Sequence, residues 1–219
     1  MTAPSVLETA PELGFAVLGA APVEHAAAPA IALSLRVEAP GGQAIRSLLL
    51  DTQVRIAARA RRYERREQER LLELFGPVEQ WGSTLRSLLW THLTLVVPPF
   101  TGSTVAELRV PCTYDMDVLG GKYIDALGDD GEVPLELLFS GTVFYAAADG
   151  RLQAARISWD EEAMFRLPVS VWRETMDRYF PGTAWLRLPK ETFDRLCAYK
   201  ARNAFASWDQ AVDELLRTH

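Results

Sequence analysis

The sequence predicts an α+β fold: an antiparallel β-sheet, a helix after the first hairpin, and a C-terminal helical subregion of about three helices. Apolar residues alternate with polar ones over much of residues 13–164, which is the period of strands. The period lengthens to that of a helix near Tyr63 and again beyond residue 165. Proline, glycine and an Asp-Gly pair separate these runs, as they do at turns.

The bulk composition is that of a globular protein. Hydrophobic residues make up 48% of the 219 and charged residues 24%, which is enough apolar material to build a core. We expect a flexible N-terminus over residues 1–12, a sheet domain with one or two helices over 13–164, and the helical subregion, packed on the sheet, over 165–219. No apolar run reaches the roughly 20 residues that span a bilayer. The N-terminus also lacks the features of a signal peptide, so we expect a cytoplasmic protein without a membrane span.

Two alternating runs, 31–37 and 48–58, predict the first hairpin. Pro40-Gly41-Gly42 lies between them and is typical of a turn. In the second run, apolar residues fall on one face and polar residues on the other, so one face of the hairpin is expected to lie in water. That polar face is predicted to carry three arginines, Arg55, Arg59 and Arg61.

The first helix is expected after Tyr63. The segment ERREQERLLELF places Leu71, Leu74 and Phe75 on one stripe, and Gly76-Pro77 ends it. Further strands are predicted near 90–97 and within 104–123. Asp149-Gly150 then predicts another hairpin turn.

The last quarter contains three amphipathic runs. Trp172, Met176 and Phe180 share the apolar face of the first, and Phe193 and Leu196 share that of the second. The third begins at the segment SWDQ, residues 207–210, which matches a capping box. These runs predict the C-terminal helices.

The stretch 54–70 holds seven arginines in a chain whose formal net charge is −6. Seven arginines less three glutamates leave the stretch at +4, and in its helical part the two residue types recur three or four apart, so they can pair. A nucleic-acid site would also be expected to carry stacking aromatic residues, and Tyr63 is the only aromatic residue in the stretch. An acidic protein partner, the chain's own DDGE segment and a solvated surface remain open for these arginines.

The sequence contains no recognisable catalytic or metal-binding motif. The three histidines form no HxxxH or HExxH pair, and the two cysteines stand far apart, so no cofactor is expected. Asp115 and Asp117 share a strand face and could together bind a divalent cation weakly. An enzyme of unrecognised type could be built only from His92 with one of these aspartates.

Three segments of the second half carry a family resemblance: GEVPLELLFSGTVFY (131–145), ISWDEEAMFRLPVSVWRETMDRYFP (157–181) and FASWDQAVDELL (205–216). They resemble an uncharacterised bacterial family whose members tend to be encoded among the genes for oxygen-tolerant uptake [NiFe]-hydrogenases and their maturation factors. The resemblance implies a role beside such an enzyme and carries over no catalytic residue.

The leading hypothesis is therefore a non-catalytic accessory or assembly protein that binds a protein partner, such as a hydrogenase subunit or maturation intermediate. Its expected contact residues are Arg55, Arg59, Arg61 and Trp159, the last lying in the segment ISWDEE. The alternatives are the His92 enzyme and a nucleic-acid binder that uses the arginines of residues 55–70, of which nucleic acid is the less favoured partner. The sequence leaves the oligomeric state open.

Overall fold

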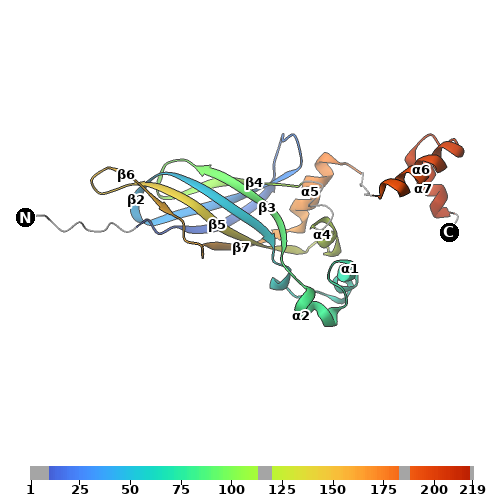
Figure 1. The fold of residues 1–219 in the computed structure, drawn as a ribbon, viewed down its shortest axis with the longest axis horizontal. Helices are drawn as coiled ribbons and strands as arrows, with labels where there is room; N and C mark the ends of the chain where they lie inside the picture. Colours follow the sequence, from blue (N-terminus) through green and yellow to red (C-terminus); the bar gives the residue numbers. More distant parts are fainter. Residues whose placement is uncertain (1–9, 113–119, 183–187, 218–219) are drawn as a thin grey trace, which may run out of the picture. The chain divides into compact units, whose positions relative to one another are not determined.

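The computed structural model describes residues 10–112, 120–182 and 188–217. The chain divides into two units, Met1–Pro181 and Gly182–His219, each considered by itself below. The first unit contains the sheet and the helices at its end, and the second contains two helices (Figure 1).

The expected α+β class is confirmed. Seven strands form one antiparallel sheet. They are β1 (Gly14–Pro22), β2 (Ala30–Ile56), β3 (Leu88–Val97), β4 (Phe100–Pro111), β5 (Glu132–Ala146), β6 (Leu152–Arg156) and β7 (Glu162–Pro168). The helices are α1 (Arg65–Phe75), α2 (Trp81–Thr84), α4 (Lys122–Ala126), α5 (Val169–Tyr179), α6 (Lys190–Arg202) and α7 (Trp208–Arg217), with short 3₁₀ turns η1 (Ala58–Ala60) and η2 (Val78–Gln80).

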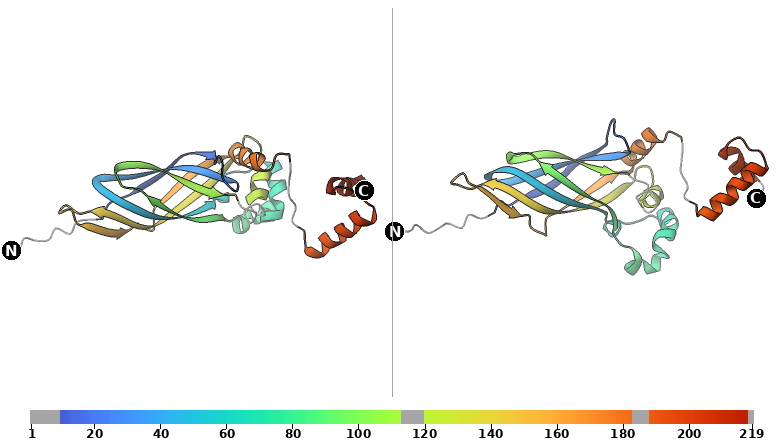
Figure 2. Two further views of the ribbon diagram at one scale, coloured as in Figure 1. Left: turned by 90° about the horizontal axis from the view of Figure 1, so that it is seen from above. Right: turned by 45° about the horizontal axis from the view of Figure 1, so that its top comes forward.

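Strand β2 organises the sheet, because its two halves pair with different neighbours. Its first half lies between β1 and β4, and its second half lies between β3 and β5. The register shifts between Ala39 and Ala44, where Gly42 has a φ of 70° that favours glycine. Figure 2 shows β2 crossing the sheet as one long, bent strand.

The expected hairpin of 31–37 with 48–58 is therefore wrong. The Pro40-Gly41-Gly42 segment bends the strand at a bulge and does not reverse it. Each half of β2 thereby gains a hydrogen-bonded neighbour on both sides, whereas a hairpin between the halves would supply one. Apolar side chains on both sides of the bend, including Ala39 and Ile45, stay in the same core.

The core lies between the two halves of the sheet and is closed at one end by helices. Leu71 and Phe75 of α1 are buried in it, as the sequence predicts, and Leu74 packs against it. Trp172 of α5 meets Trp90 of β3 edge to face, with ring centroids 5.7 Å apart. Helix α5 thus belongs to the first unit, although it lies beyond the domain boundary expected near residue 165.

The second unit consists of α6 and α7, joined by a short loop. Phe193 and Trp208 bring the two helices together, with ring centroids 5.8 Å apart. Ser207 caps α7 as the sequence predicts, because its Oγ accepts a hydrogen bond from the backbone N of Gln210 (3.2 Å). The packing of these helices on the sheet stays a prediction.

Two further expectations meet the limits of the described chain. The flexible N-terminus falls mostly on residues 1–9, which lie outside the described residues. Within the described residues, no helix combines the length and the apolar character that a membrane crossing requires.

Candidate partner-binding face

The outer face of β3, β2 and β5 carries two rows of polar side chains. Gln53 of β2 lies between His92 and Leu138 in the register, and Asp51 lies between Thr94 and Ser140. The intervening residues of β2 turn into the core, so the strand period alone places Asp51 and Gln53 outward.

Hydrogen bonds hold these rows in place across the strands. The Gln53 Nε2 and His92 Nε2 atoms lie 3.2 Å apart, and the Thr94 hydroxyl donates to the Asp51 carboxylate at 2.6 Å. His92 is exposed and is partnered by a side chain of the neighbouring strand. The rows form the floor of a groove of about 410 Å³.

Trp159 lines this groove from the turn that joins β6 and β7, and its side chain is 90% exposed. The turn is anchored to β5 at both ends: Ile157 N donates to Gly141 O (3.1 Å), and Phe139 N donates to Glu161 O (2.9 Å). A hydrogen bond from the Ser158 hydroxyl lowers the pKa of Asp160 in the same turn. The indole is therefore presented to solvent by an ordered, negatively charged turn.

Arg55 extends the same face toward the helical end of the sheet. It lies one row beyond Gln53 and opposite Glu136, whose carboxylate is 3.9 Å from its guanidinium. The Arg55 side chain remains 37% exposed, so it is available to a second carboxylate. We refer to Asp51, Gln53, Arg55, His92, Thr94, Ser140 and Trp159 as the outer face.

Arg59 and Arg61 do not continue this face, and the expectation that they do is wrong. Strand β2 ends at Ile56, and η1 then turns the chain out of the sheet. Arg59 donates to the backbone oxygens of Gly82 (3.2 Å) and Leu85.

Arg61 is largely buried and has three kinds of intrachain contact. Its guanidinium donates to the Glu67 carboxylate at 2.7 Å and to the backbone oxygen of Glu132 at 3.1 Å. It also lies 5.0 Å from the centre of the Tyr63 ring, a cation–π distance. These contacts tie the end of β2 to α1 and β5.

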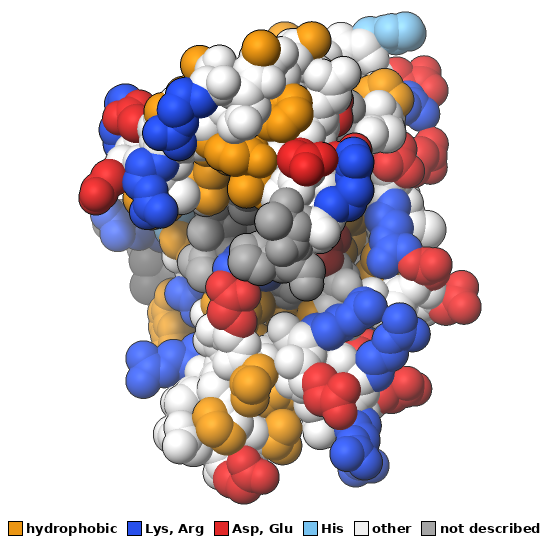
Figure 3. Space-filling view, turned by 90° about the vertical axis from the view of Figure 1, so that its right-hand side faces the viewer, with side chains coloured by type: hydrophobic (Ala, Val, Ile, Leu, Met, Phe, Trp, Pro, Cys, Tyr) orange, Lys and Arg blue, Asp and Glu red, His pale blue; other side chains and the backbone are white. Residues whose placement is uncertain are grey.

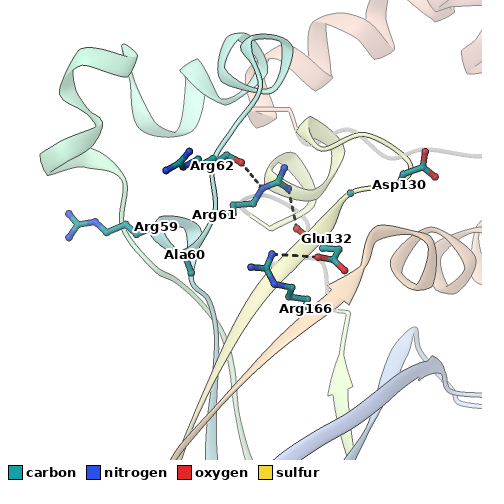
Figure 4. A pocket seen from close by; sticks show the side chains of 8 residues that line it. Arg59, Ala60, Arg61, Arg62, Asp130, Glu132 and Arg166 are labelled. Atoms are coloured by element: carbon teal, nitrogen blue, oxygen red, sulfur yellow. Dashed lines mark hydrogen bonds and ion pairs between the residues drawn. The ribbon is translucent and has the colours of Figure 1, made fainter.

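The arginines meet the chain's own acidic segment in a second, open pocket of about 590 Å³ (Figure 4). Arg61 and Arg166 both turn toward Glu132, and the Arg166–Glu132 ion pair spans 3.5 Å. Arg59 points away from Glu132 in the same view. Of the alternatives open for the arginine stretch, contact with the chain's own DDGE segment is confirmed for Arg61.

Comparison with known proteins identifies a family. A model described as a family of unknown function (DUF6084) matches residues 10–219. The chain belongs to this family. No curated protein matches the chain.

Two solved structures show a distant likeness to this family member. The putative ApaA protein from Bordetella pertussis has 11% identity and a TM-score of 0.25, covering 72% of this chain and 95% of its own. The β-glucosidase 3B from Thermotoga neapolitana, in complex with α-D-glucose, has 10% identity and a TM-score of 0.24, covering 71% of this chain and 17% of its own. Likeness at this level identifies neither a shared fold nor a shared function.

The chemistry of the outer face is that of contact. Asp115 and Asp117, expected as catalytic partners of His92 or as a weak cation site, lie outside the described residues. Among the residues that the structure describes, no three His, Cys, Asp or Glu side chains gather as a metal site. Figure 3 shows Lys and Arg side chains beside Asp and Glu side chains over the view, so no single-sign field dominates it.

The structure brings together some predicted residues and adds others. Trp159 and His92 line one groove and Arg55 shares their sheet face, although the sequence analysis assigned His92 to an enzyme and the other two to a partner surface. It did not predict Thr94 or Ser140 as site residues. Their signal was outward placement on alternating strands, but only the β3–β2–β5 order puts them beside Asp51.

Proposed function

We propose that the protein is a non-catalytic accessory protein that binds a protein partner through its outer face. The observation that carries this proposal is Trp159, an indole that is 90% exposed on an anchored turn beside a polar groove. Tryptophan and arginine dominate the binding energy of protein interfaces. Burying the exposed indole would contribute about 25 cal/mol for each Å² removed from water.

The groove beside Trp159 supports a polar contact around an apolar anchor. Gln53, His92 and Ser140 offer hydrogen-bond donors and acceptors to backbone or side-chain groups of a partner. Arg55 offers a partly exposed cation, so an acidic residue of the partner would pair with it. A central aromatic anchor with a polar rim is the usual anatomy of a non-obligate interface.

The partner that we propose is a [NiFe]-hydrogenase subunit or a maturation intermediate, met in the cytoplasm. This identity rests on the resemblance of segments 131–145, 157–181 and 205–216 to a family encoded beside such enzymes. The outer face adds the stated chemistry: an apolar protrusion-binding groove flanked by a free guanidinium.

The structure gives less support to the nucleic-acid alternative. Three of the arginines of residues 55–70, Arg59, Arg61 and Arg70, donate to backbone oxygens of the chain itself. Arg55 and Arg65 face Glu136 and Glu69. The enzyme alternative, His92 with Asp115 or Asp117, stays a prediction.

A capture experiment from the native host tests the proposal. Full-length protein should recover a hydrogenase subunit or a maturation factor from lysate, and Trp159→Ala should recover far less of it. Val105→Ala is the matched control, because Val105 is also exposed but lies on β4, away from the outer face. Recovery of no hydrogenase component by the wild-type protein would remove the proposed partner.

A further inference from the structure

The second unit carries an apolar stripe that the unit itself does not cover. On α7, Trp208, Val212, Leu215 and Leu216 recur at the first, fifth, eighth and ninth positions, which is one helical face. All four are exposed, Leu216 at 73%, and Phe193 of α6 is exposed beside them.

The stripe is wider than the seam between α6 and α7. Ala211 is fully buried and marks the side of α7 that faces α6. Leu216 is displaced from Ala211 by five residues, or about 140° around an ideal helix. Its exposure shows that the α6 contact leaves this side of the stripe open to another surface.

A helical pair of this size needs a further source of stability. Below about 40 residues, a chain usually requires a disulfide, a metal or association to hold a fold. Cys197 of α6 is a free cysteine. No metal-binding group of three His, Cys, Asp or Glu side chains is found in the described part of the unit. Association is the means that remains.

A second copy of the unit matches the stripe in charge. Helix α6 carries four basic and two acidic residues, which leaves +2, and α7 carries three acidic residues and one basic, which leaves −2. In a two-fold pair with α6 of one copy against α7 of the other, opposite net charges face each other. The described first unit offers no matching stripe, because its exposed large apolar strand residues are spread over six strands: Leu18, Leu49, Leu89, Val96, Val105, Leu152 and Met164.

We infer that the C-terminal helical pair, α6 with α7, is a homodimerisation module. Two copies bury their Trp208–Leu216 stripes against each other as a four-helix bundle, the usual way in which two helical hairpins cover their apolar faces. The inference rests on α6 and α7 alone and is independent of the partner bound by the outer face.

Light scattering of the full-length protein tests this inference. The wild-type chain is expected to have the mass of a dimer, and Leu216→Glu is expected to weaken the dimer about tenfold or more, because a carboxylate would be buried in the bundle. Leu216 makes little intrachain contact, so the variant should keep the helical circular dichroism of the wild type. Val212→Glu provides a second variant on the same stripe.

Val105→Glu is the control, since it places the same charge at an exposed apolar position of β4 and should leave the dimer intact. A monomeric wild-type chain overturns the inference, and protection of Leu216 within that monomer would assign the stripe to the chain's own sheet. A dimer that survives both α7 variants also overturns it, because another surface would then hold the copies together.

Discussion

Glu67 shows how one residue joins the arginine stretch to the fold. Its carboxylate accepts a hydrogen bond from Arg61 at 2.7 Å and another from the backbone N of Glu64 at 2.9 Å. The first contact is a largely buried ion pair, and the second completes the capping box that begins α1. The arginine stretch is thus part of the architecture before it is a surface.

Replacing Glu67 by Ala is expected to lower the free energy of unfolding by about 3 kcal/mol, because it leaves Arg61 without its carboxylate and removes a cap. Urea denaturation measures the loss. Glu69→Ala is the matched control on the same helix: its pair with Arg65 is exposed, so a change of about 0.5 kcal/mol or less is expected. Equal losses for the two variants would contradict this account of Glu67.

Alkaline pH is expected to destabilise the first unit. Burial raises the pKa of the Cys112 thiol from 9.0 to about 12, and burial also raises the pKa values of Tyr63 and Tyr123, whose hydroxyls lie 2.8 Å apart. The unfolded chain releases these protons first, so the stabilisation is complete below the unfolded pKa values and is lost as pH rises toward the folded ones.

Urea unfolding between about pH 8 and pH 11 should show this fall in the free energy of unfolding. Cys112→Ala should reduce the slope that begins near the unfolded thiol pKa of 9.0, and the tyrosine contribution should remain. A free energy that stays flat across this range would contradict the burial of all three groups.

The sequence could predict single residues only where the local pattern decides their position. Ser207, Leu71 and Phe75 lie as expected, because caps and helical stripes are local features. Arg59 and Arg61 were misplaced because the end of β2 at Ile56 depends on pairing with distant strands. No local period records where such pairing stops.

At the scale of elements, the close approach of β2 and β5 depends on Gly141. Its φ is 134°, and a Cβ built there would lie 2.1 Å from the backbone oxygen of Leu49. The same residue accepts the hydrogen bond from Ile157 that anchors the Trp159 turn. One glycine therefore joins the sheet pairing to the presentation of the indole.

Gly141→Ala is expected to lower the free energy of unfolding by about 3 kcal/mol or more, through backbone strain and displacement of β2. Thermal or urea unfolding measures it. Gly14→Ala serves as the control, since no atom lies within 4 Å of its added Cβ, and it should change stability by about 0.5 kcal/mol or less. A Gly141→Ala variant as stable as the control would show that β2 and β5 do not approach as described.

Most strands and helices were predictable, and their pairing was not. The alternating runs 31–37 and 48–58 are both strands, as expected, yet they are two halves of β2. A Pro-Gly-Gly segment suits either a reversal or a bulge, and the choice is made by β1, β4, β3 and β5, which lie elsewhere in the chain. The groove depends on the same choice, since β3 and β5 flank β2 only in this topology.

At the scale of the whole molecule, the two units supply separate surfaces. The outer face lies on the sheet unit, and the stripe of α7 lies on the helical unit. If both proposals hold, a dimer presents two outer faces, and a partner with two binding sites would be held with increased avidity. Disrupting the dimer would then weaken capture of a bivalent partner without changing the affinity of a single outer face.

The most direct test of the central claim is the affinity of the full-length protein for the captured hydrogenase subunit or maturation factor, measured for the wild type and for Trp159→Ala. We predict a loss of about 30-fold in affinity, the effect of removing a tryptophan hot spot of about 2 kcal/mol. The variant should unfold at the same urea concentration as the wild type, because the side chain is 90% exposed. Equal affinity of the two proteins would contradict the claim that the outer face binds the partner.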